Sequence, residues 1–328
     1  MNQNKLGFVM TPGYITGLAQ TEGTFFCTVS ISANHLFGLQ FRPKFAITFD
    51  LDSIHVLEAI KIHFNCGNIY INTKSHSAEY VVSSLTELVN IIIPHFKDHP
   101  LFCAKLHAFQ LFSKITLAMY GKQNRTLEGR RELLIWALSM NTTTNRKESR
   151  IELLFSKLGI VEDKHKLLIV NLIKTIDTAI TDNIITGIID GDGSFYISFG
   201  KNGNIKTGFS IVTDSSSRVL LEGIQNKLNG IGSIKTGSKN EVVLTVSGLN
   251  QINDVLIPFM DNNNLLSERA SHYEGFRHVS QLLKNKNTLT LEDKIELVEL
   301  YYNANKDGKR RLLTKSEYLE NLKSSYSN

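Results

Sequence analysis

The chain has 328 residues, of which 42% are hydrophobic and 20% are charged, so it is long enough for two globular domains with packed cores. Its formal net charge of +5 fits a polyanionic partner but does not identify one. The three cysteines form no Cys-x-x-Cys pair, which argues against a disulfide framework or a cysteine zinc site, and no apolar run reaches the roughly 18 residues of a membrane span.

The first half of the chain begins with a short apolar stretch at 13–23 that ends in Glu22 and a glycine. Apolar spacing and turn residues then predict an alternation of strands and helices. The helix that starts at Leu85 is expected to end at Pro94, because proline lacks the amide hydrogen that continues a helix. The predicted elements after the first stretch are strands 24–32 and 39–49, helix 53–64, strands 69–72 and 79–82, and helices 85–93, 101–120 and 127–138.

The second half repeats this order after another short apolar stretch, 184–193, which ends in Asp192 and a glycine. Glu22 and Asp192 lie 170 positions apart, whereas later landmarks such as Phe45 and Phe209 lie 164 apart, so the second copy is shorter between its first two strands. The predicted elements are strands 195–200 and 207–212, helix 217–228, strands 233–236 and 242–246, and helices 249–260 and 265–283.

This repetition predicts an α+β chain of two pseudo-symmetric αββαββα repeats, each with a four-stranded antiparallel sheet. We expect an N-terminal repeat at 1–141, a partly helical connector at 142–182 and a C-terminal repeat at 183–328. Residues 324–327 are serine-rich and are expected to form a frayed tail.

The two apolar stretches are expected to be helices that pack on each other through small residues. Gly13 and Gly17 are four residues apart, as are Gly187 and Gly191, and each pair therefore lies on one helix face. If the helices pack side by side in parallel, Glu22 and Asp192 emerge together at one end. Crowded carboxylates at helix C-termini repel each other, and Mg²⁺ with its preference for oxygen ligands would relieve that repulsion.

One face of each predicted sheet carries polar side chains that suit hydrogen bonding to base edges and phosphates in a DNA major groove. Alternation along the strands gives the apolar positions to the helix-covered face and leaves the polar ones on the other. The candidate DNA-binding residues are Thr28, Ser30, Ser32, Gln40, Arg42, Lys44, Asn72 and Lys74 in the first repeat, and Ser198, Lys201, Asn204, Lys206, Ser210, Lys239 and Asn240 in the second.

The two motifs and the duplicated unit resemble the LAGLIDADG homing endonucleases, in the single-chain form with two motifs. The nine-residue signature is matched at 15–23 and again at 185–193, and the resemblance runs from about residue 10 to 300. It implies a saddle of two sheets that straddles duplex DNA in the major groove, in a monomer. It also implies cleavage of both strands to leave short 3′ overhangs, and a mitochondrial, intron-encoded origin.

The resemblance further implies the catalytic groups. Glu22 and Asp192 would bind divalent ions, helped by the backbone carbonyls of Thr21 and Gly191, and Lys235 would stabilise charge near the reacting phosphate. The cofactor would be two or three Mg²⁺ ions, for which Mn²⁺ or Ca²⁺ can substitute in binding. An ordinary phosphate contact is the alternative role for Lys235.

The chain departs from the family pattern at several positions. Position six of the signature is Gln20 in one repeat and Asp190 in the other, and we expect this residue to support the helix. A polar residue that organises water is frequent on the second strand of the family. The corresponding residues here are Ala46 or Phe49 in the first repeat and Ser210 or Thr213 in the second, and Tyr70 stands where the second repeat has Lys235.

Two other functions remain open. The same fold could assist splicing of a group I intron RNA, for which a basic patch away from the sheets would be needed; the candidates are Arg125, Arg130, Arg131, Arg146, Lys147 and Arg150. Alternatively, the chain could bind DNA without cutting it, although the presence of both acids argues against this. The absence of a nucleotide-binding glycine motif or a metal-binding His-Glu-x-x-His makes a small-molecule enzyme a distant possibility. The N-terminus has no signal-peptide or presequence pattern, and the cysteine usage fits a reducing compartment inside the cell.

Overall fold

The computed structural model describes residues 10–140, 147–161, 179–200, 203–237, 240–286, 288–303 and 313–326. The chain divides into two compact units, Met1–Gly187 and Ile188–Asn328, and each contains one four-stranded antiparallel sheet. The predicted α+β class with a repeated unit is therefore confirmed. The expected domain boundaries at 141 and 183 stay a prediction. None of the described helices is both long and apolar enough to cross a membrane.

Unit 1 follows the predicted order, with additional short helical turns. Its strand order is β1-β2-β4-β3. Helix α8 begins in this unit and ends in the next one. The elements are α1 (Pro12–Thr21), β1 (Gly23–Ile31), η1 (Leu36–Gly38), β2 (Leu39–Asp50), η2 (Leu51–Ser53), α2 (Ile54–Phe64), β3 (Asn68–Asn72), β4 (Ser77–Val82), α3 (Leu85–Glu87), η3 (Leu88–Ile92), α4 (Ile93–Asp98), α5 (Cys103–Tyr120), η4 (Gln123–Arg125), α6 (Leu127–Ser139), α7 (Glu148–Lys157) and α8 (Asp182–Asp192).

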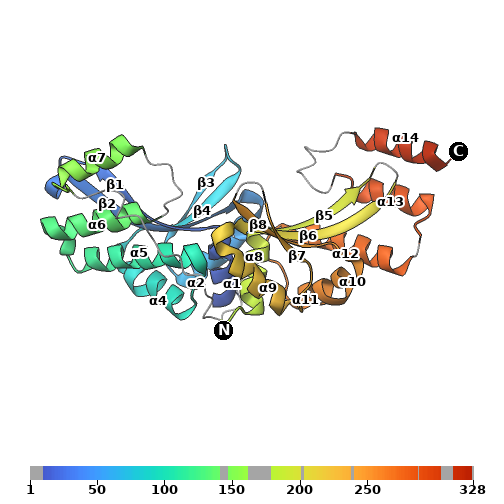
Figure 1. Ribbon diagram of the computed structural model, residues 1–328, viewed down its shortest axis with the longest axis horizontal. Helices are drawn as coiled ribbons and strands as arrows, with labels where there is room; N and C mark the ends of the chain where they lie inside the picture. Colours follow the sequence, from blue (N-terminus) through green and yellow to red (C-terminus); the bar gives the residue numbers. More distant parts are fainter. Residues whose placement is uncertain are drawn as a thin grey trace. The chain divides into compact units, whose positions relative to one another are not determined.

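Unit 2 repeats the arrangement, with the strand order β5-β6-β8-β7. Figure 1 shows α2, α4 and α5 on one face of the first sheet, and α10 and α12 on one face of the second. The elements are β5 (Gly193–Phe199), β6 (Ile205–Asp214), η5 (Ser215–Ser217), α9 (Arg218–Lys227), β7 (Ser233–Thr236), β8 (Glu241–Val246), α10 (Leu249–Gln251), η6 (Ile252–Leu256), α11 (Ile257–Asn262), α12 (Arg269–Asn285), α13 (Leu291–Tyr301) and α14 (Lys315–Tyr326).

The helix-covered face of each sheet forms an aromatic core. In unit 1 the ring of Phe25 stacks on Phe45 with centroids 4.9 Å apart, and the edge of Phe96 lies 5.1 Å away. In unit 2 Phe195 and Phe209 repeat the first pair at the same 4.9 Å separation. Each of these side chains is at most 4% exposed. Burial of several large rings is the main stabilising contribution on this side of the sheet. The opposite face, here called the open face, carries the alternate side chains of the strands, such as Thr28 and Arg42 in unit 1 and Ser198 and Lys206 in unit 2.

The expectation that a helix ends at Pro94 is wrong. Helical backbone runs without a break from Leu85 to Asp98, with a π-helical turn at Leu88–Ile92 immediately before the proline-containing segment. A π-turn shifts the hydrogen-bonding register by one residue, and the helix thereby continues past a residue that cannot donate. The same arrangement recurs at Pro258, where the π-turn is Ile252–Leu256.

Two further expectations differ from the structure in unit 2. The long helix predicted from Leu265 begins only at Arg269, because the amides before it are hydrogen-bonded to Asp190. The expected frayed tail is wrong for the described residues up to Tyr326, which belong to helix α14. This helix is fixed by Tyr318, whose hydroxyl donates to the Gly200 carbonyl at 2.8 Å, and by an apolar cluster shared with α13.

Candidate active site

The first motif helix ends in a way that fixes the position of its acid. Helix α1 starts at the N-cap Thr11, whose hydroxyl accepts from the Tyr14 amide at 3.2 Å. It ends at Glu22, whose amide donates to the Leu18 carbonyl at 2.8 Å. Gly23 then enters strand β1 directly, and a Cβ there would lie 2.4 Å from the Ala19 carbonyl oxygen. Glycine is therefore required at position 23 because a side chain there would clash with the last turn of α1. Its backbone is not in the left-handed conformation that often ends a helix.

Hydrogen bonds to residues at the start of α5 support this end of α1. The Gln20 amide group accepts from the Phe102 amide at 2.9 Å and donates back to the Phe102 carbonyl at 3.3 Å. Lys105 donates from its ammonium group to the Gly23 carbonyl at 2.5 Å. Further along α1, the Thr16 hydroxyl donates to the His99 carbonyl at 3.0 Å. The motif helix is thus tied to the α4–α5 connection along its length.

The second motif helix approaches the first without intervening side chains. Within unit 1, a Cβ on Gly187 would lie 2.2 Å from the Tyr14 carbonyl oxygen and 2.7 Å from the Leu18 amide nitrogen. A Cβ on Gly13 would lie 3.2 Å from the Cβ of Asn183. The first half of α8 therefore packs backbone to backbone on α1, and the separation of the helices depends on glycine.

In unit 2 an ionic network holds the end of α8. The Asp190 carboxylate is fully buried and accepts from the amides of Leu266 at 2.6 Å and Ser267 at 3.2 Å, and from the Ser267 hydroxyl. Arg269 donates to three carbonyls: Asp190 at 2.7 Å, Gly193 at 2.6 Å and Gly191. Charged donors make strong hydrogen bonds, so this network fixes the backbone on both sides of Asp192.

Lys105 and Arg269 were not among the residues selected from the sequence. They lie 164 positions apart, which is the offset of the later landmarks, and each bonds carbonyls where a motif helix meets a strand. The sequence feature that could have identified them is a basic residue at the equivalent position near the start of the long helix in each repeat.

The two motif acids differ in exposure. Glu22 is half-buried in unit 1 and Asp192 is exposed in unit 2. Each acid and the backbone carbonyl before it offer oxygen donors, from Glu22 and Thr21 in unit 1 and from Asp192 and Gly191 in unit 2, and oxygen donors suit a hard divalent cation. The Gly191 carbonyl already accepts from Arg269, and its second lone pair is what a metal would use. The residues therefore fit such an ion.

The candidate DNA-binding residues of unit 1 lie mainly on the open face of its sheet. Thr28 pairs with Arg42, and Ser30 with Gln40, directly across β1 and β2. Lys44 forms an ion pair with Glu79 at 3.1 Å. The remaining three residues lie at the ends of hairpins. Ser32 bonds His35, Asn72 accepts from the amides of Lys74 and Ser75, and the Lys74 side chain is exposed.

In unit 2 the open face carries Ser198 paired with Lys206, while Ser210 lies further along β6. Asn204 is exposed just before that strand. Asn240 has a positive φ of 57° and accepts from the Ser215 hydroxyl at 2.5 Å, so it shapes the turn before β8. Lys201 and Lys239 lie outside the described residues.

The structure shows on which face of each sheet the residues lie that differ from the family pattern on the second and third strands. Ala46 and Ser210 lie on the open faces, opposite Val81 and Thr245. Phe49 is 7% exposed and belongs with the core residues of its strand, as does the equivalent position 213. Lys235 is exposed on β7, and its counterpart Tyr70 is 57% exposed.

Three histidines from α2 and the end of α4 cluster next to the connection that contacts α1. The rings of His63 and His99 lie 5.9 and 5.3 Å from His95, which also packs against Phe64 and Phe96. The Nε2 atom of His95 is buried without a hydrogen-bond partner. Burial, reinforced by the neighbouring histidines, lowers the pKa of His95 to about 3, and burial also lowers the pKa of His63. His95 and His63 are therefore neutral at pH 7.

The basic residues considered for RNA binding are partly used in the fold. Arg130 is 5% exposed and donates to the carbonyls of Leu39 and Asn124. Arg131 donates to the Leu158 carbonyl at 2.9 Å and so fixes the end of α7. Arg125, Lys147 and Arg150 are exposed, and Arg146 lies outside the described residues. Two of the described members of this set, Arg130 and Arg131, therefore serve the fold of unit 1.

Comparison with known proteins gives one family. The family described as LAGLIDADG endonuclease matches residues 15–116 and 185–280, which together make up more than half of the chain. The matched ranges include both motif acids and all eight strands of the part of the chain that the structure describes.

Curated relatives and a solved structure agree with this match. "Probable intron-encoded endonuclease 2" of Neurospora crassa is 29% identical over 300 residues, which cover 89% of this chain and 64% of the relative. "Probable intron-encoded DNA endonuclease 1" of Mycosarcoma maydis is 28% identical over 68% of this chain and 82% of its own length. The structure of the I-LtrWI LAGLIDADG homing endonuclease bound to target DNA is 25% identical, covers 90% of this chain and 97% of its own, and superposes with a TM-score of 0.80. This chain thus spans less than two thirds of the Neurospora relative.

Proposed function

The chain belongs to the LAGLIDADG endonuclease family, and on that premise we propose that it is a homing endonuclease that cuts both strands of a long, largely asymmetric DNA site. The observation that carries the proposal is the repeated motif-helix end. In each unit a helix finishes on a carboxylate, and a basic side chain from the following long helix bonds the adjoining backbone. Two copies of one arrangement suit a reaction carried out once on each strand.

The proposed cofactor is Mg²⁺, and the residues that would hold it are Glu22 and the Thr21 carbonyl in unit 1, and Asp192 and the Gly191 carbonyl in unit 2. When bound, such an ion activates water and neutralises charge on a phosphate. Arg269 holds the Gly191 carbonyl in place, and Lys105 does the same for Gly23. Both are positioning residues in this proposal, whereas Lys235 is the exposed cation that would stabilise a reacting oxygen.

The open faces are proposed to lie in the DNA major groove. Directly paired polar residues on neighbouring strands, such as Ser30 with Gln40, can present several donors and acceptors to adjacent base edges. Recognition would also draw on the shape and deformability of the DNA. The family resemblance adds a short 3′ overhang, action as a monomer and a mitochondrial location to the proposal.

Cleavage of a randomised duplex library in Mg²⁺ tests the proposal. The parent chain is expected to select one long site and cut both strands there, and sequencing of the product ends gives the overhang. Glu22→Gln and Asp192→Asn should each bind the selected duplex without cutting both strands. Cleavage by both variants at the parental rate would contradict the assignment of the acids.

The same experiment separates the remaining alternatives. Selective binding without cleavage by the parent would indicate a DNA-binding protein that has lost catalysis. Failure to bind any duplex selectively, together with rescue of intron RNA splicing, would indicate a maturase. The use of Arg130 and Arg131 inside unit 1 favours the endonuclease over the maturase, because it removes two cations from the expected RNA surface.

A further inference from the structure

Each sheet contains a hairpin whose tip, the turn between its first two strands, lies far from the motif acid of its unit. The tip is residues 32–38 in unit 1 and lies between Phe199 and Ile205 in unit 2. Strands β1 and β5 start directly after Glu22 and Asp192. At about 3.3 Å per residue, they place the tips roughly 30 and 23 Å from these acids. In the proposed function, the tips therefore meet outer base pairs of the site, not those beside the cleaved bonds.

The tip of unit 2 is held by helix α14. Two hydrogen bonds close the tip: the Gly200 amide donates to the Asn204 carbonyl at 2.8 Å, and the Gly203 amide donates to the Gly200 carbonyl at 3.0 Å. The Tyr318 hydroxyl donates to this same Gly200 carbonyl at 2.8 Å. Gly203 has a φ of +68°, and a Cβ there would lie 2.6 Å from Leu322 Cδ1. Helix α14 thus contacts the backbone of the tip at two points.

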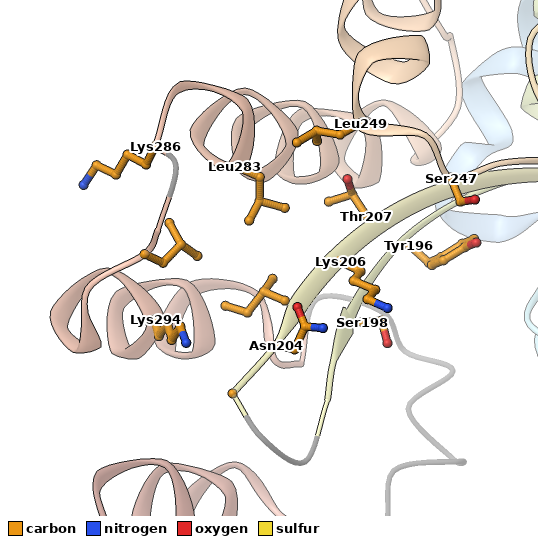
Figure 2. A pocket seen from close by; sticks show the side chains of 13 residues that line it. Tyr196, Ser198, Asn204, Lys206, Thr207, Ser247, Leu249, Leu283, Lys286 and Lys294 are labelled. Carbon is orange, nitrogen blue, oxygen red and sulfur yellow. The ribbon is translucent and has the colours of Figure 1, made fainter. Parts of the chain in front are cut away.

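The ring of Tyr318 is itself fixed by its neighbours. It lies 5.2 Å from the ring of Tyr302 and 6.0 Å from that of Phe199, the last residue of β5, and Tyr318 is only 4% exposed. Helix α13 also reaches the tip, since Lys294 and Asn204 line the same groove of about 450 Å³ (Figure 2). Because the ring cannot move freely, its hydroxyl group holds the Gly200 carbonyl in one place.

The tip of unit 1 is held by Arg130 from helix α6. Arg130 donates to the carbonyl of Leu39, the residue directly after the tip, at 2.6 Å. Its guanidinium lies 5.7 Å from the centre of the Phe37 ring in the tip and 5.8 Å from that of Phe41. Arg130 is 5% exposed, so it holds the tip from behind.

The position of this support recurs in the repeat, but the donor does not. Leu39 and Arg130 stand 164 positions before Gly203 and Lys294, which is the offset of the later landmarks. The Lys294 ammonium lies 3.6 Å from the place of a Cβ on Gly203, whereas the hydrogen bond to the tip backbone comes from Tyr318 of the next helix. The duplication explains why a helix lies beside each tip. It does not explain why two different side chains bond the tip backbone.

Both supports come from helices outside the segments that match the family. The matched ranges are 15–116 and 185–280, whereas α6 and α14 lie beyond them. The tips themselves lie inside the matched ranges. A support that the matched segments do not contain suits a property particular to this chain, and the bases that it prefers are such a property.

A purely structural role is the alternative, because a satisfied carbonyl stabilises a fold wherever it lies. The location of the bonds favours a role in recognition. Ser32 and Asn204, two of the candidate DNA-binding residues, belong to the tips, and Asn204 is exposed. A hydrogen bond to a base edge weakens steeply when its distance or angle changes. Discrimination between bases at a tip therefore requires that its backbone keep one conformation.

We infer that Tyr318 and Arg130 are positioning residues for DNA recognition, each of which fixes one hairpin tip and so sets the base preference at an outer part of the site. The inference rests on the proposed function for the duplex, but it assigns specificity to two buried side chains that contact no base. Loss of either bond lets the tip adopt further conformations, and the correct base then gains less affinity over the wrong one.

The test measures the affinity of the full chain, in Ca²⁺, for its selected duplex and for every single-base-pair variant of that duplex. Tyr318→Phe removes one hydroxyl group and keeps the ring. It is expected to lower discrimination roughly two- to tenfold in one outer block of base pairs, and to leave the base pairs beside the cleaved bonds unchanged. Arg130→Met should act in the same way on a different outer block. Arg130→Lys should recover part of that loss, because an ammonium group can still donate to the Leu39 carbonyl.

Tyr302→Phe is the matched control. Tyr302 belongs to the same ring cluster, but its hydroxyl donates to the Leu313 carbonyl at 3.0 Å instead of to the tip. This variant should keep the parental base preference throughout. Hydrogen exchange without DNA gives an independent measurement: the Gly200 and Gly203 amides should exchange faster in Tyr318→Phe than in the parent or in Tyr302→Phe.

The inference is overturned if Tyr318→Phe or Arg130→Met keeps the parental base preference, or if either one lowers discrimination evenly over the whole site. An equal effect of Tyr302→Phe would overturn it as well. Each of these outcomes leaves the endonuclease function intact. A parent chain that selects no duplex would overturn the proposed function together with this inference, and hydrogen exchange would then still show whether Tyr318 holds the tip.

Discussion

At the scale of single residues, the end of the second motif helix depends on one guanidinium. Arg269 serves three carbonyls, of Asp190, Gly191 and Gly193, while the equivalent Lys105 serves one, of Gly23. The planar fork of arginine allows several parallel bonds that a lysine ammonium cannot reproduce. The backbone around Asp192 is therefore more strongly fixed than the backbone around Glu22.

Arg269→Ala is expected to lower the free energy of unfolding by roughly 3 kcal/mol, because three carbonyls lose a charged donor. Arg269→Lys should recover part of this loss. Denaturant unfolding measures both. Arg277→Ala is the control, since Arg277 forms a partly exposed ion pair with Asp261 at 3.0 Å and its loss should cost less than about 1 kcal/mol. Equal losses for Arg269→Ala and Arg277→Ala would contradict the assigned importance of Arg269.

Gly187→Ala is expected to destabilise the chain by roughly 1–3 kcal/mol, because its methyl group would overlap the Tyr14 carbonyl and the Leu18 amide of the neighbouring helix. The measurement is the denaturant midpoint at unchanged slope. Gly121→Ala provides the matched control: Gly121 has a φ of −73°, and its added Cβ would meet nothing closer than 3.4 Å. That substitution should be neutral or slightly stabilising, and a Gly187→Ala variant that behaves the same way would refute close helix packing.

At the scale of elements, alternation and apolar spacing predicted the strands well. Strand 233–236 has the predicted bounds, and the first two strands differ from the prediction by at most one residue at either end. The two errors have different causes. Pro94 does not end its helix because a π-turn in the same helical stretch precedes it, whereas the helix at Arg269 starts late because the distant Asp190 binds the amides before it. The second effect is not encoded in the local sequence of the helix itself.

The histidine cluster between α2 and α4 predicts how stability changes with pH. The folded-state pKa of His95, about 3, lies below the ordinary value of 6.5. Below pH 6.5, His95 binds a proton in the unfolded chain but not in the folded chain. The free energy of unfolding therefore falls as the pH decreases from 6.5 towards 3. At about 1.4 kcal/mol per pH unit, we expect a loss of at most roughly 2 kcal/mol between pH 7 and 5 from this residue.

Urea unfolding of the parent and of His95→Phe at pH 7 and pH 5 measures this effect. Phenylalanine suits the site because His95 already packs edge-on against Phe64 and Phe96. The variant should lose less stability than the parent on acidification. An equal loss in the two proteins would show that His95 is protonated in the folded chain or that other groups dominate.

At the scale of the whole molecule, the duplication made the site predictable. A single helix ending in an acid and a glycine is weak evidence of chemistry, and only the recurrence 170 positions later selected Glu22 and Asp192. The sequence did not identify the supporting basic residues. Lys105 lies in α5 and Arg269 in α12, and neither of these long helices contains a recognisable motif. Their role becomes visible only once the helix is folded against the motif carbonyls.

Binding of divalent ions provides a test of the site that does not require a DNA substrate. A ligand that binds only the folded chain stabilises it by about 2.7 kcal/mol at 100 times its dissociation constant. Ca²⁺ should therefore raise the melting temperature of the parent, and chelation should reverse the shift. The Glu22→Gln Asp192→Asn double variant should show little shift, because both carboxylate ligands are lost.

Among the described residues, Asp50, Asp52 and His76 form an exposed group whose ligand atoms lie within 4.8 Å of one another, so Ca²⁺ could also bind there. His76 bonds Asp52 at 3.0 Å, and Asp50 accepts from the Asp52 amide, which gives this group a structural role at the turn before α2. Asp52→Asn is therefore the necessary control. A Ca²⁺ shift that survives in Asp52→Asn but disappears in the double variant assigns the ion to the motif acids. The opposite pattern would assign it to the turn and leave Glu22 and Asp192 without a metal-binding role.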